Sequence, residues 1–135
     1  MVVGLGAAIR DDKGKIVAVL SKPFPGVFSA DTGEFLALRE GLLLAKNLNL
    51  SVQIDEVDAP NVASILNSSA PFLGDASFIV DDIKALCLEV GICKCQAIPR
   101  LGNTLAHNLA SMALPSLQEC SRLDSSLFCP HFHVL

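Results

Sequence analysis

The sequence predicts an α/β domain in which a mixed β-sheet is flanked by helices. Three observations predict this class. Two apolar runs joined by a short polar turn open the chain, apolar residues then recur at helical spacing, and strands alternate with helices from residue 51 onward. The expected order of elements is β-β-α-β-α-α-β-α, which places a hairpin at the start of a sheet and packs helices against its faces.

The opening hairpin is predicted by residues 2–10 and 15–21, which are β-like and apolar. The polar link between them contains Gly14, and a short glycine-containing turn between two such runs is typical of a hairpin. Pro23 and Pro25 follow the second run, and we expect them to end it because proline has no backbone donor.

A helix over residues 32–48 is predicted next, because Leu38, Leu42 and Ala45 recur at helical spacing. Asp31 or Thr32 is the expected N-cap. The remaining predicted elements are a strand over 51–57, helices over 59–67 and 77–90, a strand over 92–98 and a helix over 103–114. Residues 116–135 have no clear period, so we expect a domain over residues 1–115 and a C-terminal tail over 116–135.

Composition restricts the possible function classes. The chain has 135 residues and a net charge of −4, with no apolar run near the ~20 residues of a membrane helix and no signal peptide at its start. The acidic balance argues against broad, non-specific nucleic-acid binding. Five cysteines without a secretory signal indicate reduced thiols in a cytosolic or nuclear compartment. The group Cys129, His131 and His133 would need a fourth ligand to hold a metal, so we expect a frayed tail there.

Two carboxylates form the candidate site. Glu34 lies near the start of the first predicted helix, and Asp58 directly follows the strand over 51–57. A carboxylate on a helix and another at a strand end can converge on a divalent metal ion, which makes phosphoryl-transfer chemistry possible. Asp55 and Glu56 point to opposite faces of the strand, so only one of them can share the face of Asp58. Taken alone, Glu34 would be a carboxylate favoured by the helix dipole and Asp58 a helix cap.

Four segments together resemble a known family. They are GLGAAIRD (residues 4–11), EFLALREGL (34–42), VDA (57–59) and the pair IPR and NTLAHNLA (98–100 and 103–110). In this order and spacing they are similar to the plant ribonuclease H-like domain, which is related to the ribonuclease H part of retroelement polyproteins. The resemblance covers residues 3–114.

The resemblance implies a five-stranded mixed sheet with flanking helices, and hydrolysis of the RNA strand of RNA–DNA hybrids by two Mg²⁺ ions held on carboxylates. Glu34 and Asp58 match two metal ligands of the family. His107 falls where many active members have a further aspartate, and it would act near the site as a proton carrier. The implied cofactor is Mg²⁺, with Mn²⁺ as the alternative, and the implied partner is an RNA–DNA hybrid or another nucleic acid.

One part of the family pattern is missing. Active members begin with a central strand that carries the first catalytic aspartate, and this sequence has no matching residue, so we expect an N-terminally truncated version of the fold. The sheet must then close differently or expose an edge. Three functions follow as alternatives: an active hybrid endonuclease, an inactive module that binds nucleic acid or protein, and a retroelement-derived fragment. With few anionic ligands, Mg²⁺ would bind weakly.

Overall fold

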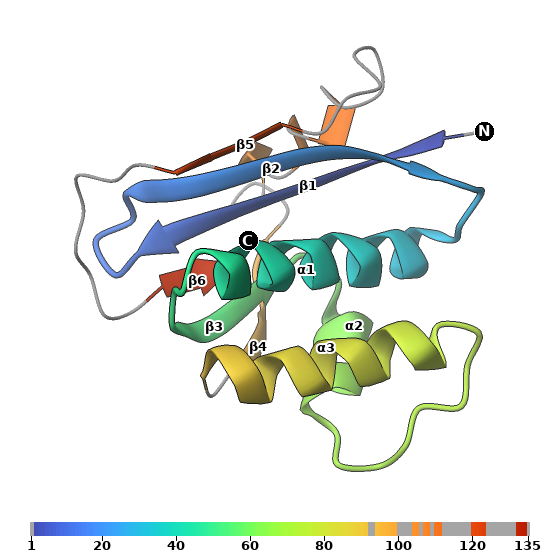
Figure 1. Cartoon of the computed structure of the whole chain (residues 1–135). Coiled ribbons are helices and arrows are strands. Elements are labelled where there is room, and N and C mark those ends of the chain that lie inside the picture. The colour runs from blue at the N-terminus through green and yellow to red at the C-terminus, as the bar shows by residue number, and fades with distance from the viewer. Residues whose placement is uncertain are drawn as a thin grey trace.

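The structure, a computed structural model, describes residues 2–91, 94–99, 104–105, 107–108, 110–111, 120–123 and 132–134. These residues form a six-stranded mixed sheet accompanied by helices (Figure 1), which confirms the predicted class. The elements are β1 (Val2–Asp11), β2 (Ile16–Pro25), α1 (Ala30–Asn47), β3 (Val52–Val57), α2 (Pro60–Asn67), α3 (Ser77–Val90), β4 (Lys94–Ala97), β5 (Cys120–Leu123) and β6 (Phe132–Val134).

The opening hairpin is present. Strands β1 and β2 pair antiparallel along their whole length, from Val2 opposite Pro25 to Arg10 opposite Ile16. The side chain of Asp11 closes the turn, because its Oδ1 accepts hydrogen bonds from the backbone N–H groups of residues 13 and 15 at 2.9 and 2.8 Å. A polar turn between two apolar runs therefore produced the element that its sequence predicted.

The second strand runs further than expected. β2 continues through Pro23 and Pro25, which lie opposite Gly4 and Val2. On its other side β2 pairs with β5 only from Ala18 to Ser21. Beyond Ser21 the described pairings of β2 involve β1 alone. A proline there, which has no backbone N–H, therefore removes no hydrogen bond to a strand on the other edge of β2. The expectation that the prolines end the strand was wrong for this reason.

The segment that follows residue 116 contributes two short strands. The sheet order is β4-β3-β6-β1-β2-β5, so β6 lies between β3 and β1 at the centre. It runs parallel to β3 and antiparallel to β1, with His133 opposite both Ile54 and Arg10. The expected frayed tail is thus corrected for residues 120–123 and 132–134, whereas Cys129 and His131 lie outside the described residues. The domain boundary after residue 115 stays a prediction.

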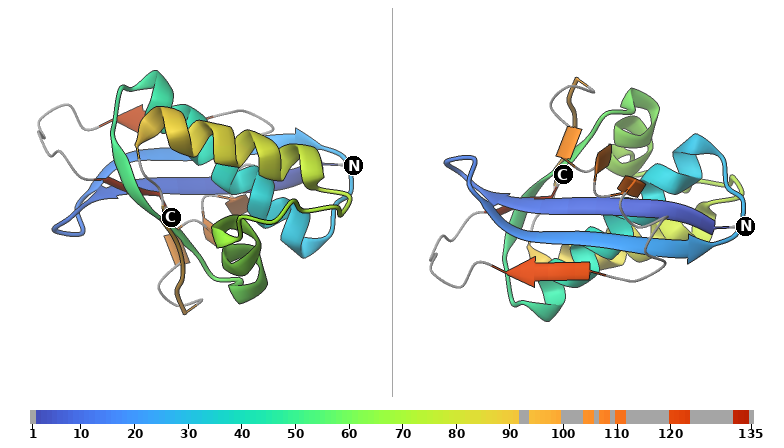
Figure 2. Two further views of the ribbon diagram at one scale, coloured as in Figure 1. Left: turned by 90° about the horizontal axis from the view of Figure 1, so that it is seen from below. Right: turned by 90° about the horizontal axis from the view of Figure 1, so that it is seen from above.

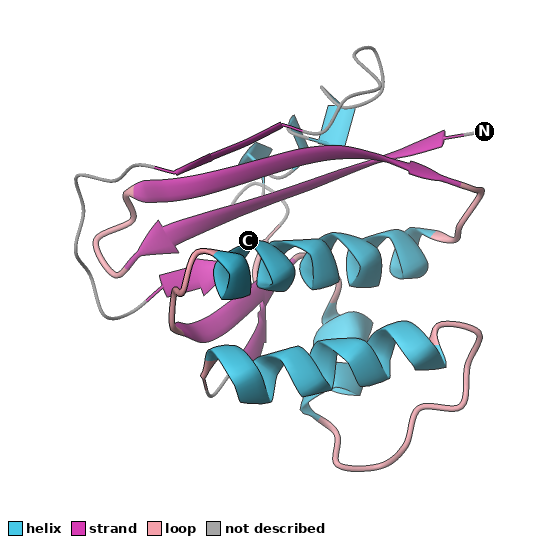
Figure 3. Cartoon of the chain, in the orientation of Figure 1, coloured by secondary structure: helices cyan, strands magenta, loops and turns pink. Residues whose placement is uncertain are grey.

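Helix α1 lies between the β1–β2 hairpin and α3, and α2 lies beside β3 and β4 (Figures 2 and 3). One apolar cluster joins these layers. Its fully buried members include Ile9, Phe35, Leu42, Ala45, Val52, Val62 and Val80. The N-cap of α1 is Ser29, whose hydroxyl accepts a hydrogen bond from the Thr32 N–H at 3.2 Å. The helix therefore begins two residues before the predicted 32–48 span, and neither Asp31 nor Thr32 is the cap.

The later elements follow the sequence closely. Helix α3 occupies the predicted span over 77–90, and its buried positions are Val80, Ile83, Leu86 and Val90. The expected strand over 92–98 is found as β4, with residues 92 and 93 outside the description. Of the predicted helix over 103–114, residues 104–105, 107–108 and 110–111 are described and are helical. Among the described residues, no helix combines the length and apolar character that crossing a bilayer demands.

Gly91 gives a test of the join between α3 and β3. It ends α3 with φ +140°, and a Cβ atom there would lie 2.8 Å from the Val52 carbonyl oxygen. Gly91→Ala should lower the free energy of unfolding by about 1–3 kcal/mol, because an alanine is strained in this conformation. Gly33 has open space around its Cβ position inside α1, so Gly33→Ala should raise stability by about 0.5–1 kcal/mol. Urea unfolding measures both, and equal effects would contradict the packing at Gly91.

His133 gives a test of the central strand. A proline there removes one backbone donor from a residue with neighbours on both sides. His133→Pro should lower the free energy of unfolding by at least about 1 kcal/mol, whereas His133→Thr, which keeps the donor, should change it far less. Chemical denaturation followed by circular dichroism compares the two. A proline variant as stable as the threonine variant would show that β6 does not pair in solution.

Candidate metal centre

Three elements deliver the predicted site residues to one place. Glu34 projects from the second turn of α1, which begins at Ala30 after the Ser29 cap. Asp58 follows β3 directly, before α2 begins at Pro60. His107 comes from the helical residues of the 104–111 segment. The packing of α1 on the sheet and the end of β3 therefore position the two carboxylates.

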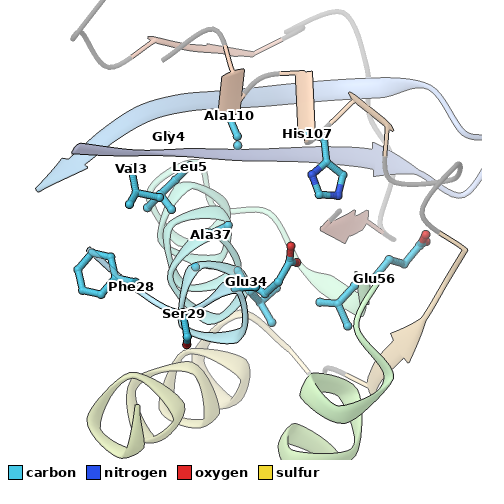
Figure 4. Close-up of a pocket in the computed structure, with 15 residues that line it drawn as sticks. Val3, Gly4, Leu5, Phe28, Ser29, Glu34, Ala37, Glu56, His107 and Ala110 are labelled. Carbon is cyan, nitrogen blue, oxygen red and sulfur yellow. The ribbon is translucent and has the colours of Figure 1, made fainter. Parts of the chain in front are cut away.

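The structure brings Glu34, Asp58 and His107 together. One ligand atom from each residue lies within 4.8 Å of the others, and all three residues are half-buried. The His107 Nε2 atom lies 2.6 Å from Asp58 Oδ2, and the Glu34 carboxylate faces the imidazole across the site (Figure 4). Two carboxylates and a nitrogen at this spacing fit a divalent cation, because one ion can reach a donor atom from each residue.

A cavity of ≈ 250 Å³ opens beside this cluster. One wall is apolar and comes mainly from β1 and α1, while Glu34 and His107 supply a carboxylate and an imidazole group (Figure 4). The apolar lining includes Val3, Leu5, Ala37, Leu38 and Val57. The cluster is therefore next to open space that a polar ligand can enter.

Glu56 is the carboxylate that the sequence left undecided. It lines the cavity, whereas Asp55 points to the other face of β3, where Oδ2 accepts a hydrogen bond from the Cys87 thiol at 3.4 Å. Glu56 is 5% exposed and forms an ion pair with Arg10 of β1. Strand alternation, continued to Asp58, selects Glu56 because residues two apart point to the same face, and the lining of the cavity agrees.

The Arg10–Glu56 pair crosses the central strand. Arg10 and Ile54 both lie opposite His133, so the ion pair connects β1 to β3 over β6. Sequence reasoning did not find this pair, because Arg10 and Glu56 are 46 residues apart and belong to strands that are not direct neighbours. The signal available was that both strands contain charged residues, Arg10 and Asp11 in β1 and Asp55 and Glu56 in β3.

A comparison with protein families shows the family of this chain. The sequence profile of a family described as reverse transcriptase-like matches residues 2–113, a span that contains Glu34, Asp58 and His107. No curated protein matches the chain.

The ion pair beside the site has a measurable effect on stability. Arg10→Met removes the cation next to a carboxylate whose side chain is 6% exposed, and should lower the free energy of unfolding by about 1–3 kcal/mol. Adding Glu56→Gln should recover part of this loss, since a neutral amide is cheaper to bury. A double-mutant cycle by urea unfolding measures the coupling.

The matched control for this cycle is the exposed pair Lys46–Glu89, whose side chains are each 50% exposed. Lys46→Met should cost less than about 0.5 kcal/mol, because water screens that pair. Equal coupling in the two pairs would contradict a structural role for Arg10 and Glu56.

Proposed function

Because the chain belongs to the reverse transcriptase-like family and carries a ribonuclease H-like, nucleic-acid-related domain, we propose that it hydrolyses the RNA strand of RNA–DNA hybrids. The observation that supports this most is the convergence of Glu34, Asp58 and His107 within 4.8 Å beside a cavity. The proposal includes the likeness to plant, retroelement-related domains that the sequence motifs indicated.

Glu34 and Asp58 would hold the metal ion, because carboxylate oxygens are the donors that hard divalent cations prefer. When bound, such an ion supplies a Lewis acid that lowers the pKa of a water molecule and stabilises charge on phosphoryl oxygens. Asp58 is well placed for this, since its side chain is 11% exposed and its position at the end of β3 is fixed. Glu34 faces it from a helix packed into the core.

His107 would transfer a proton. Its side chain is 34% exposed, so the imidazole contacts both the site and the solvent. The hydrogen bond between Nε2 and Asp58 Oδ2 orients the ring toward the carboxylates. A ring held this way can take a proton from an attacking water or give one to a leaving oxygen.

A second function, an inactive module that binds nucleic acid or protein, is favoured by one observation. Within the part of the chain that the structure describes, the cluster contains two carboxylates and one imidazole. A smaller anionic set opposes the dehydration cost of Mg²⁺ less effectively, so occupancy at cellular Mg²⁺ would be low. The same assay distinguishes the two functions.

The experiment is cleavage of a labelled RNA–DNA hybrid by this chain in Mg²⁺ and then in Mn²⁺. Glu34→Gln keeps the size of the side chain but removes the charge of one metal ligand. Since loss of groups that merely orient ligands costs about 10–100-fold, loss of a ligand should reduce cleavage by at least about 100-fold. Gel analysis of the RNA strand measures the rate.

Glu89→Gln is the control for this experiment, because it makes the same chemical change at an exposed residue of α3 far from the cluster. It should cleave at the rate of the unmodified chain. Cleavage that survives Glu34→Gln would disprove the site. No cleavage by a folded protein, combined with hybrid binding in a gel-shift assay, would establish the inactive module instead.

A further inference from the structure

We propose that His107 makes this centre a mixed nitrogen–oxygen site that selects Mn²⁺ over Mg²⁺. The inference rests on the metal site of the proposed function, but not on catalysis, and it assigns His107 Nε2 to the ion in place of proton transfer. It would hold for an inactive module as well as for a nuclease. It concerns which ion occupies the cluster formed by Glu34, Asp58 and His107.

The chemistry of the donor atoms distinguishes Mn²⁺ from Mg²⁺ at this cluster. Mg²⁺ prefers an environment made of oxygen, from carboxylates and retained water molecules. Imidazole nitrogen suits first-row transition ions, and Mn²⁺ accepts nitrogen while keeping the carboxylate and water ligands that Mg²⁺ also uses. Replacing one of three oxygen donors by the nitrogen of His107 therefore weakens Mg²⁺ binding more than it weakens Mn²⁺ binding.

The charge of the ligand set also affects which ion binds. Glu34 and Asp58 contribute two negative charges, and a neutral imidazole contributes none. Mg²⁺ loses its water molecules reluctantly and needs a strong field to do so, whereas Mn²⁺ is easier to dehydrate and gains from the covalent character of a nitrogen ligand. A site with two negative charges and one ring nitrogen therefore lowers the affinity for Mg²⁺ for two reasons, the small charge and the nitrogen donor.

The Nε2 atom of His107 already lies beside a carboxylate of the cluster. His107 Nε2 lies 2.6 Å from Asp58 Oδ2, so the ring is oriented toward the carboxylates before any ion arrives. Its helical backbone fixes the direction from which it approaches. The hydrogen bond requires a proton between Nε2 and the Asp58 oxygen, and an ion that binds displaces that proton and takes its place between the two donor atoms.

The test measures binding directly. Titration of the protein with Mn²⁺, followed by the electron paramagnetic resonance signal of the free ion, gives the Mn²⁺ affinity. Displacement of the bound ion by Mg²⁺ gives the Mg²⁺ affinity in the same sample. We expect Mn²⁺ to bind at least about tenfold more tightly than Mg²⁺. In His107→Asp, Mg²⁺ should bind more tightly and the preference should fall by about tenfold or more.

Two further variants separate nitrogen from charge. His107→Gln removes the imidazole without adding a charge, so it should weaken Mn²⁺ binding and leave Mg²⁺ binding no tighter. The double variant with His131→Gln and His133→Gln leaves His107 as the one histidine in the chain. Electron spin-echo modulation from nitrogen coupled to bound Mn²⁺ should persist in that double variant and disappear in His107→Asp.

The outcomes are separate from those of the cleavage assay. An equal preference for Mn²⁺ in the unmodified chain and in His107→Asp, with both proteins folded by circular dichroism, would overturn the inference. Nitrogen modulation that vanishes with the double variant would also overturn it, because the ion would then sit on His131 or His133. A selective, His107-dependent Mn²⁺ site in a protein that cleaves nothing would refute the proposed nuclease and leave the selectivity intact.

Discussion

The structure depends on how two halves of the sheet are joined. One half is the β1–β2 hairpin with α1 packed on it, and the other is the parallel pair of β3 and β4. They meet through β6 and through the ion pair between Arg10 and Glu56. Glu34 belongs to the first half and Asp58 to the second, so the spacing of the two carboxylates is set by this join.

Most of the fold follows from long, regular patterns in the sequence. The hairpin, α1 and α3 each extend over ten or more residues, and their apolar spacing is too consistent to suggest another structure. β5 and β6 could not be predicted, because these strands of four and three residues lie in a segment that shows no period around them. What places them is the need of neighbouring strands for hydrogen-bonding partners, which is a property of the whole sheet.

Less of the candidate site than of the fold could be predicted from the sequence. A carboxylate near a helix start and another at a strand end suggested convergence of Glu34 and Asp58, because sites form where such ends meet. His107 was suggested only by family resemblance, since a histidine within a helical pattern can lie on the surface as readily as in a site. Glu56 was left as one of two choices, although it lies two residues before Asp58 and strand alternation places such residues on one face. Local pattern thus finds positions, and tertiary packing decides their use.

The central position of β6 has a consequence for folding during synthesis on the ribosome. Val57 ends β3 and Phe132 begins β6, so 75 residues of synthesis separate the two neighbours. During that interval the hairpin and the β3–β4 pair can each form, but the row of main-chain groups that β6 later covers has no partner from β6. A nascent chain in this state is exposed to pairing with other strands until β6 has been synthesised and has left the exit tunnel.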